Sequence, residues 1–471
     1  MEDLYYPSYH FRPEKNWMND PNGPVWFQGN YHLFYQYNPY GDQWGTIHWG
    51  HAVSADLIRW EELSTALIPV ADAGEIHCYS GCVTIREGIP HLFYTSVGTG
   101  DRGPKTGAQQ WSAVSYDGMR TWERKGMPAI PESLHGDRKI EMWRDPFLWQ
   151  EDGGWYAVLG GTEDQKGCLL LYYSDDLEHW EYLNKIYESE TYWLVECPVM
   201  LPLGGDRYLI LYSPLDAVHY MTASLNRRSW TLEVEREGIF DHSILKNGFY
   251  APNTWLNDPK GRMLIMGWIS EADRPAASGV NGWAGMQSLP REVTEEADGT
   301  LRIRPAEECE MLRGKLLANE HACVPFQTEE RRIRLASSRA AELLLHAEVG
   351  EEGRLFLSFF SEEEGREETQ LVYDGKTHRL TLDRSRSSLW EGVNQRELSC
   401  CLAPVRELEI RVYIDHSVME VFACGQETIT ARVYPKLPES TGIYIQGQDE
   451  VRIRDLKIWE LSTEEGKRRS Q

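Results

Sequence analysis

Three acidic residues, Asp20, Asp145 and Glu196, stand at matching places along the chain. Each aspartate directly precedes a proline, Glu196 precedes one by two positions, and a hydrophobic strand-like run follows each acid. Proline fixes φ and disfavours helical geometry in the residue before it, so each acid is presented where an extended segment begins. A single Asp-Pro is usually an ordinary turn. Three such acids in equivalent positions instead indicate one shared site with carboxylate chemistry.

A repeat in the N-terminal part explains how these acids could meet. Trp60, Trp122, Trp180 and Trp230 end successive units of roughly 50–60 residues. Each unit contains strand-like segments around a glycine-containing turn, as at residues 25–35, which is typical of hairpins. A repeat of this length predicts the blades of a β-propeller. Acids that start the innermost strands of different blades would converge on one central funnel.

We therefore predict an all-β protein of two domains. Residues 1–304 are expected to form a five-bladed β-propeller that carries the site. Residues 305–317 begin with proline, carry acids in their first turn and contain Gly314, which indicates a short helical linker. Residues 318–471 show alternating strands without the acid–proline units and are expected to form a β-sandwich. Residues 275–282, rich in Ala, Ser and Gly, are expected to be a surface loop.

Composition and charge exclude several classes of partner. The formal net charge is −25 at pH 7, and both nucleic acids and anionic membranes bind basic surfaces, so neither is expected as a partner. The sequence contains no apolar run of about 18 residues, so we predict no transmembrane helix. The first residues lack a signal-peptide pattern, and nine irregularly spaced cysteines suit a reducing compartment. We expect a cytoplasmic protein, either monomeric or homo-oligomeric.

Several motifs, in order along nearly the whole chain, resemble glycoside hydrolase family 32. They are Trp-Met-Asn-Asp-Pro-Asn-Gly at 17–23, Phe-Tyr-Gln-Tyr-Asn-Pro at 34–39, Trp-Gly-His-Ala-Val-Ser at 49–54, Arg-Asp-Pro at 144–146, Glu-Cys-Pro at 196–198, Phe-Tyr-Ala-Pro at 249–252 and Ile-Asp-His-Ser-Val-Met-Glu-Val-Phe at 414–422. The resemblance implies a five-bladed propeller beside a β-sandwich. It also implies retaining hydrolysis of β-fructofuranosides, such as sucrose, sucrose 6-phosphate or fructo-oligosaccharides, without a cofactor.

The resemblance also implies a role for each acid. Asp20 is expected to be the nucleophile that attacks C2 of a fructosyl unit, and Glu196 the acid/base. Asp145 is expected to bind the fructose 3- and 4-hydroxyls and to stabilise the transition state. A negative charge on Asp20 would help to keep a nearby Glu196 protonated. By the same motifs, the expected substrate-binding residues are Asn19, Gln36, Trp44, Ser80, Arg144, Tyr250 and Trp268.

Some of these residues have ordinary structural explanations. For Trp44, Trp268 and Tyr250, plain packing within the propeller is the alternative to sugar binding. His48 and His51 have a spacing that can bind a metal, but no acidic or cysteine partner stands at a fitting distance in the sequence. We therefore expect no metal and no cofactor.

Three departures from the family pattern bear on the leaving group. An Asp commonly precedes Phe-Tyr-Ala, where this chain has Gly248, and many bacterial members have Asp where it has Val199. The chain also reads Tyr-Ser-Gly-Cys at 79–82, where Phe-Ser-Gly-Ser is frequent. Because the three acids are intact, the reaction class is unaffected, but we expect sucrose to be a mediocre substrate.

Two other functions are compatible with these motifs. Fructosyl transfer uses the same catalytic residues with a sugar acceptor in place of water. A sugar-binding propeller without catalysis is the alternative from another class. The intact set of Asp20, Asp145 and Glu196 argues against it, because binding alone requires neither a nucleophile nor an acid.

Overall fold

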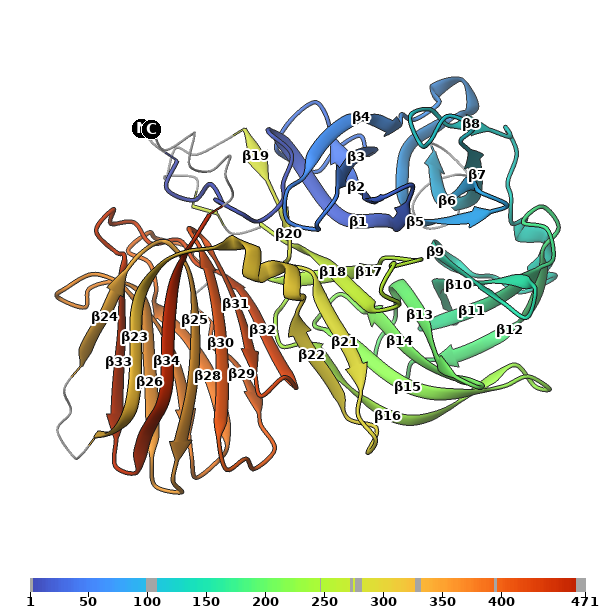
Figure 1. Ribbon diagram of the computed structural model, residues 1–471. Coiled ribbons are helices and arrows are strands. Elements are labelled where there is room, and N and C mark those ends of the chain that lie inside the picture. Colours follow the sequence, from blue (N-terminus) through green and yellow to red (C-terminus); the bar gives the residue numbers. More distant parts are fainter. Residues whose placement is uncertain are drawn as a thin grey trace.

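The computed structural model describes residues 3–98, 108–245, 247–271, 274–275, 282–326, 332–393 and 396–462. Their regular structure is almost entirely β-strand, which confirms the predicted all-β class (Figure 1). The exceptions are the short 3₁₀ helices η1 (Ala71–Ala73), η3 (Glu132–His135) and η5 (Glu307–Leu312). In the described segments, no helix is long and apolar enough to cross a membrane. Residues 276–281 of the predicted surface loop lie outside the described ranges.

The N-terminal part is a propeller of antiparallel sheets arranged around an axis (Figure 1). The first sheet contains β1 (Asn16–Phe27), β2 (Asn30–Asn38), β3 (His48–Ser54) and β4 (Glu61–Leu67). The second contains β5 (Glu75–Arg86), β6 (Ile89–Gly98), β7 (Ala108–Val114) and β8 (Glu123–Arg124). The third contains β9 (Glu141–Glu151), β10 (Gly154–Glu163), β11 (Lys166–Ser174) and β12 (Glu181–Glu188).

Two further sheets complete this part and bring its end back to its beginning. One contains β13 (Glu196–Gly204), β14 (Arg207–Ser213), β15 (Val218–Asn226) and β16 (Thr231–Asp241). The other contains β17 (Phe249–Thr254), β18 (Met263–Ile269), β20 (Met286–Gln287), β21 (Arg291–Glu295) and β22 (Leu301–Pro305). The short β19 (Trp283–Ala284) pairs in parallel with β1 and so ties the end of the propeller to its first sheet.

The innermost strands are irregular where they carry the acid motifs. Pairing shifts register between Met18 and Pro21 in β1 and between Glu196 and Val199 in β13. Similar shifts occur in the ladders of β5, β9 and β17. A bulge breaks the alternation of a strand and redirects its side chains. These irregularities therefore allow consecutive residues of each motif to serve one site.

Positive φ angles occur at the same places. Asp145 has φ of 61° and Cys197 has φ of 47°. Outside glycine this conformation is uncommon, and a strained residue costs on the order of 1–3 kcal/mol. Such strain persists only where the surrounding structure enforces it, and it occurs here in the motifs that carry two of the three acids.

The C-terminal part is a sandwich of two six-stranded sheets, drawn in orange and red in Figure 1. One sheet contains β23 (Arg313–Phe326), β34 (Val451–Leu461), β25 (Ala340–Val349), β30 (Leu408–Asp415), β31 (Val418–Ala423) and β32 (Glu427–Arg432). The other contains β24 (Ile333–Ser337), β33 (Gly442–Gln448), β26 (Arg354–Ser361), β27 (Glu368–Asp374), β28 (Arg379–Arg386) and β29 (Leu398–Cys401). Inward-facing residues such as Leu343, Leu357 and Ile410 form a continuous core between them.

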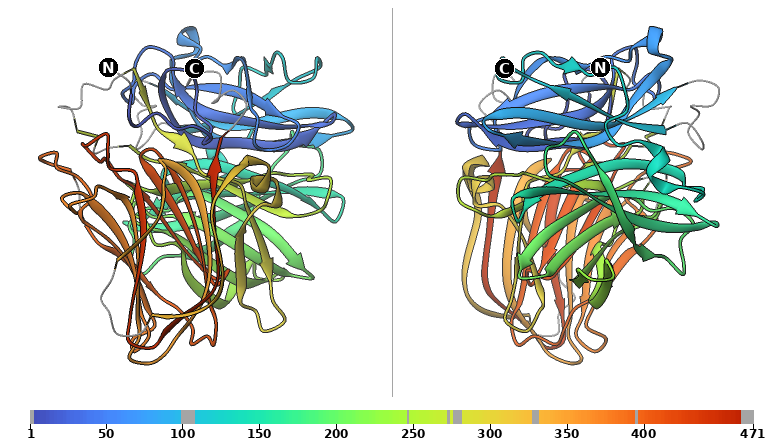
Figure 2. Two further views of the ribbon diagram at one scale, coloured as in Figure 1. Left: turned by 60° about the vertical axis from the view of Figure 1, so that its left-hand side comes forward. Right: turned by 90° about the vertical axis from the view of Figure 1, so that its right-hand side faces the viewer.

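A buried ionic network joins the two parts, which lie side by side in every view (Figures 1 and 2). The guanidinium of Arg291 in β21 donates to Asp241 at 2.8 Å and to Glu420 of the sandwich at 2.7 Å. His10 lies between Asp415 and Glu420, at 2.9 and 3.0 Å. Burial alone would lower the pKa of His10, but its hydrogen bonds to the two carboxylates outweigh burial and raise it to about 9. In this network the negative charges of the buried carboxylates are therefore balanced by the positive charges of Arg291 and His10.

We expect Arg291→Ala to destabilise the fold by about 3–5 kcal/mol, because it leaves the buried Asp241 without its cation and Glu420 with only His10. The matched control is Lys125→Ala, which removes an exposed ion pair with Glu178 and should cost less than about 1 kcal/mol. Urea unfolding of both variants measures the difference. Equal destabilisation by the two substitutions would contradict a special role for the buried network.

Candidate active site

The propeller brings the three predicted acids together around Cys197. The backbone N–H of Cys197 donates to Asp145 Oδ2 at 2.9 Å, and the Cys197 Sγ lies 3.4 Å from the same oxygen. The same Sγ lies 3.6 Å from Asp20 Oδ2. The charge of Glu196 acts on Asp145 and the charge of Asp20 acts on both, so carboxyl groups from β1, β9 and β13 share one site. The Asp145 backbone N–H is held in turn by the Thr95 hydroxyl at 2.9 Å.

Asp20 lies at the end of a directed chain of hydrogen bonds. The indole N–H of Trp17 donates to Asn19 Oδ1 at 2.8 Å, which leaves the Asn19 amide nitrogen as a donor. That nitrogen donates to Gln36 Oε1 at 2.6 Å and to Asp20 Oδ1 at 3.1 Å. The Gln36 amide then donates to the Ser80 hydroxyl. The Ser80 hydroxyl donates to Asp20 Oδ2 at 2.5 Å.

The direction of these hydrogen bonds determines which charge state of Asp20 they favour. Both carboxyl oxygens of Asp20 accept hydrogen bonds, from Asn19 and from Ser80. Hydrogen bonds to a carboxylate favour its ionised form. The network therefore orients Asp20 and favours the charged state that a nucleophile requires.

Glu196 has different neighbours, a cation and a phenol. Arg144 Nη1 lies 3.2 Å from Glu196 Oε1, and the Arg144 Nε–H is tied to the Met142 carbonyl at 3.0 Å. The Tyr250 hydroxyl lies 2.9 Å from Glu196 Oε2. These contacts hold both carboxyl oxygens in place without using the donors that surround Asp20.

The Tyr250 hydroxyl can serve either protonation state of Glu196. It accepts a hydrogen bond from the Leu215 N–H at 2.9 Å, and it lies 3.1 Å from the Ser213 carbonyl oxygen. It can donate its one proton to an ionised Glu196. Alternatively, it can accept from a protonated Glu196 and donate to Ser213. This group is therefore suited to a carboxyl that changes protonation state during a reaction.

Burial raises the pKa of all three acids. For Asp20, hydrogen bonds from Ser80, Asn19 and Cys197 act in the opposite direction. For Glu196, the Arg144 charge and the Tyr250 hydrogen bond oppose burial. For Asp145, burial outweighs the Arg144 charge, and the two other acids add to it, so its pKa rises to about 7. Burial and the two neighbouring acids all disfavour a charge on Asp145, so the site favours retention of a proton.

The predicted aromatic residues occupy two positions. Trp268 packs edge-to-face on Trp17, with ring centroids 5.7 Å apart, and it pairs with Tyr250 across β17 and β18. Trp44 is 51% exposed and contacts His77 in a tilted arrangement, with ring centroids 4.9 Å apart. The exposure of Trp44 argues against a purely packing role, because a core tryptophan would be covered.

Two of the three positions that depart from the family pattern, Gly248 and Val199, are enclosed. A Cβ added at Gly248 would lie 2.4 Å from Ser243 Cβ and 2.6 Å from the Thr430 carbonyl oxygen. A side chain there would therefore collide with the sandwich and with its own loop. Val199 is 2% exposed and lines the narrow channel beside Asp20 and Asp145.

The histidines that raised the question of a metal are held by ordinary contacts. His48 Nδ1 lies 2.9 Å from the Thr46 carbonyl oxygen. His51 Nε2 lies 3.0 Å from His32 Nδ1 and stacks on Phe34. Burial lowers the pKa of His48 and of His51, in the latter case to about 3. Both are accounted for by packing.

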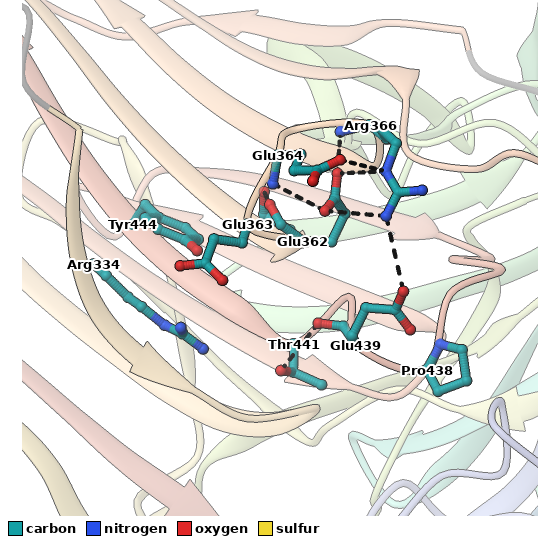
Figure 3. Close-up of a pocket in the computed structure, with 10 residues that line it drawn as sticks. Arg334, Glu362, Glu363, Glu364, Arg366, Pro438, Glu439, Thr441 and Tyr444 are labelled. Carbon is teal, nitrogen blue, oxygen red and sulfur yellow. Dashed lines mark hydrogen bonds and ion pairs between the residues drawn. The ribbon is translucent and has the colours of Figure 1, made fainter.

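A separate cavity of about 460 Å³ lies in the sandwich, and Arg366 in its wall is paired with three glutamates (Figure 3). Arg366 Nε lies 3.2 Å from Glu362 and 3.4 Å from Glu364, and Arg366 Nη2 lies 3.9 Å from Glu439. None of the sequence motifs contributes to it, so the propeller pocket is the candidate active site.

Comparison with known proteins agrees with this assignment. Residues 10–305 match the N-terminal domain of glycosyl hydrolases family 32, and residues 308–460 match its C-terminal domain. The chain is 30% identical to a sucrose-6-phosphate hydrolase of Zymomonas mobilis, covering 97% of this chain and 92% of the relative. It is 31% identical to a raffinose invertase of Escherichia coli, covering 98% and 96%. The crystal structure of fructan 1-exohydrolase IIa from Cichorium intybus with 1-kestose superposes with a TM-score of 0.85, at 25% identity and 98% coverage of both chains.

A propeller followed by a sandwich, with three carboxyl groups gathered in one propeller site, fits a glycosidase, and the family match shows that class. The chain belongs to glycosyl hydrolases family 32. The protein is accordingly a retaining hydrolase of the β-fructofuranosidase type. The family predicted from the sequence motifs is confirmed.

Proposed function

We propose that Asp20 is the nucleophile and Glu196 the acid/base of this reaction. The observation that carries the proposal is the contrast in their surroundings. Asp20 accepts hydrogen bonds at both oxygens, which favours a carboxylate. Glu196 contacts a tyrosine hydroxyl that can accept as well as donate. Retaining hydrolysis requires one ionised and one protonated carboxyl group, and these two environments supply them.

In the first step, Asp20 attacks C2 of the fructosyl unit, and the bond from C2 to the glycosidic oxygen breaks. Glu196 gives its proton to that oxygen, so the leaving group departs as a neutral alcohol. In the second step, the ionised Glu196 takes a proton from water, whose oxygen attacks C2 and releases Asp20. The Tyr250 hydroxyl follows the change by turning its proton from Ser213 to Glu196.

The remaining residues position the sugar. We propose that Asp145 binds fructose hydroxyls and balances positive charge that develops at the ring in the transition state. Asn19, Gln36 and Ser80 orient the nucleophile and offer polar atoms to the sugar. Arg144 fixes Glu196. Trp268, whose indole N–H has no acceptor among the described residues, and Trp44 cover faces of the bound sugars.

The proposed role of Tyr250 predicts a change in the pH profile. In Tyr250→Phe, Glu196 loses a hydrogen bond that lowers its pKa, so its pKa should rise. Because Glu196 must be protonated to donate, the alkaline limb of kcat/KM should move to higher pH. The rate at the optimum should fall about tenfold, the value of one hydrogen bond to a charged group. The control Tyr187→Phe removes a hydroxyl whose hydrogen bond among the described residues is to Tyr212. An unmoved alkaline limb in Tyr250→Phe would contradict the proposal.

For the leaving group, we propose a preference for fructosyl–fructose linkages over sucrose. Many bacterial family members carry an Asp at the position of Val199, which lines the channel beside Asp20 and Asp145, so an acceptor for leaving-group hydroxyls is missing there. Such hydrogen bonds typically discriminate by about 1–3 kcal/mol. The likeness to a fructan exohydrolase with bound 1-kestose supports this direction, whereas the relatives that are named for sucrose 6-phosphate and raffinose support others.

The test is the release of fructose from a panel of substrates. We expect kcat/KM for inulin-type and levan-type disaccharides to exceed that for sucrose and sucrose 6-phosphate. A lead of sucrose by more than about tenfold, or roughly 1.4 kcal/mol in the transition state, would overturn the preference while leaving the catalytic assignment intact. Product analysis at high sucrose concentration distinguishes hydrolysis from fructosyl transfer, which the same residues could perform.

For the chain as a whole, we propose the division expected from sequence: a five-bladed propeller in residues 1–304, a linker in 305–317 and a sandwich in 318–471. The position of η5 supports it, and β23 already begins within the linker, at Arg313. We also propose a cytoplasmic location. The eight cysteines whose side chains the structure describes are free thiols, the state that a reducing compartment maintains. Fractionation of cells that produce the protein tests this location.

A further inference from the structure

A second group of chemically reactive side chains lies away from the acids, at the junction of the propeller and the sandwich. His242, Cys400 and Glu427 each direct one ligand atom into a common space, and these atoms lie within 4.8 Å of one another. His242 Nε2 is 2.6 Å from Glu427 Oε2. The Cys400 thiol is buried, whereas the side chains of His242 and Glu427 are 17% and 28% exposed. Solvent therefore reaches the group from one side.

The three residues come from three different sheets. His242 directly follows β16, the last strand of its propeller sheet, and its backbone N–H donates to the Thr428 carbonyl at 2.8 Å. Cys400 lies in β29 and Glu427 begins β32, each an edge strand of one sandwich sheet. Figure 1 shows β29 and β32 on the side of the sandwich nearer the propeller. A ligand held by all three residues would therefore link three sheet edges.

The donor set matches a particular class of cation. Thiolate, imidazole and carboxylate are the protein ligands of Zn²⁺, at about 2.0–2.3 Å. Around a tetrahedral zinc ion, ligand atoms lie roughly 3.3–3.7 Å apart, so the 2.6 Å contact between His242 and Glu427 must open by about 1 Å. Both side chains are partly exposed and Glu427 stands at the start of its strand, so side-chain rotation can supply this opening. The bound ion would replace the direct contact between His242 and Glu427.

We propose that His242, Cys400 and Glu427 form a structural site for a divalent cation of the zinc class, with water as the fourth ligand. The simpler alternative is a histidine–glutamate hydrogen bond beside an unreactive thiol. The proposal differs from it in two consequences. Binding deprotonates the thiol and releases a proton to solvent. It also links the propeller to both sheets of the sandwich, so the bound ion stabilises their contact. The proposal is independent of the proposed substrate and of the catalytic roles.

Cobalt(II) is the spectroscopic probe for this site. The whole protein is freed of metal with a chelator, dialysed and titrated with Co²⁺. We expect one equivalent to produce a near-ultraviolet sulfur-to-cobalt charge-transfer band together with the visible bands of tetrahedral cobalt. Zn²⁺ should abolish both and raise the thermal midpoint of unfolding. Titration without a charge-transfer band would overturn the proposal.

The adjacent cysteines supply a matched pair of variants. Cys400→Ser should abolish the charge-transfer band, whereas Cys401→Ser, which changes an exposed thiol, should leave it unchanged. Glu427→Gln retains the shape of the side chain and should weaken Zn²⁺ binding by about tenfold or more. The Glu427→Gln variant also tests the site by zinc binding if Cys400→Ser folds poorly. Retention of the band in Cys400→Ser, or unchanged zinc affinity in Glu427→Gln, would contradict the assignment.

Discussion

Asp20→Ala is expected to lower kcat by at least about 10⁴-fold, equivalent to roughly 5.5 kcal/mol in the barrier. The substitution removes the atom that forms the bond to C2, so neither Glu196 nor Asp145 can rescue the first step. The loss should be similar for every β-fructofuranoside, because a nucleophile acts on the fructosyl unit whatever the leaving group. Initial rates of fructose release, with the folded state monitored by circular dichroism, measure it.

Ser80→Ala is the control for Asp20. It removes one donor to Asp20 Oδ2 but leaves the nucleophile, so the loss should be about 10- to 100-fold, the cost of one hydrogen bond to a charged group. The pKa of Asp20 should also rise in this variant, because the lost bond favours the carboxylate. Since Asp20 must be ionised to attack, the acid limb of kcat/KM should move to higher pH. If Asp20→Ala lost no more activity than Ser80→Ala, another residue would have to be the nucleophile.

The gathering of the acids was predictable from sequence because it follows from local patterns. Proline next to the acids, strand alternation and a regular repeat each depend on a few neighbouring residues, and together they predict that Asp20, Asp145 and Glu196 begin equivalent strands. In the structure only Glu196 begins its strand, whereas β1 and β9 start at Asn16 and Glu141, before their aspartates. The separate sandwich was predictable for the same reason, because its strands continue after the acid–proline units end. The family and the all-β class are confirmed.

The supporting contacts were not predictable, because they join distant parts of the chain. Cys197 and Asp20 are 177 positions apart, yet the thiol lies 3.6 Å from the carboxyl group. The Glu-Cys-Pro motif drew attention to Glu196 and not to its neighbour. Likewise, nothing near Tyr250 in the sequence indicates that the Ser213 carbonyl lies beside its hydroxyl. Residue type and spacing predict which groups meet, whereas the direction of each hydrogen bond emerges only from the folded backbone.

Gly248 shows that a sequence pattern can also suggest a change at the site that the structure explains differently. From the sequence, Gly248 stands where family members commonly have an Asp beside the pocket. In the structure, the space of its absent side chain is filled by Ser243 and by the Thr430 carbonyl of β32. Restoring an aspartate at this position would therefore strain the contact between propeller and sandwich, and substrate comparison is a better test of leaving-group preference than that substitution.

Glu196→Gln is expected to have an effect that depends on the leaving group. For sucrose, whose leaving group is a poor one, kcat/KM should fall by about 10³-fold, within the usual range for loss of a general acid. For an activated aryl fructoside, whose phenolate leaves without a proton, the loss should be below about tenfold, because the first step no longer needs Glu196. The amide keeps the size of the side chain, so binding of the sugar should change little.

The pH profile separates this role from a merely structural one. Burial raises the pKa of Glu196, and the protonated form is the one that donates, so wild-type kcat/KM falls as pH rises through that pKa. Glutamine cannot titrate, and the alkaline limb should therefore disappear in Glu196→Gln. The matched control is Glu163→Gln, which alters another enclosed glutamate, paired with Arg138 and Lys185, and should keep both the limb and the ratio between substrates. An equal loss on sucrose and on the aryl fructoside would mean that Glu196 does not protonate the leaving oxygen, and the acid would then have to be sought in Asp145, whose pKa of about 7 leaves it partly protonated at neutral pH.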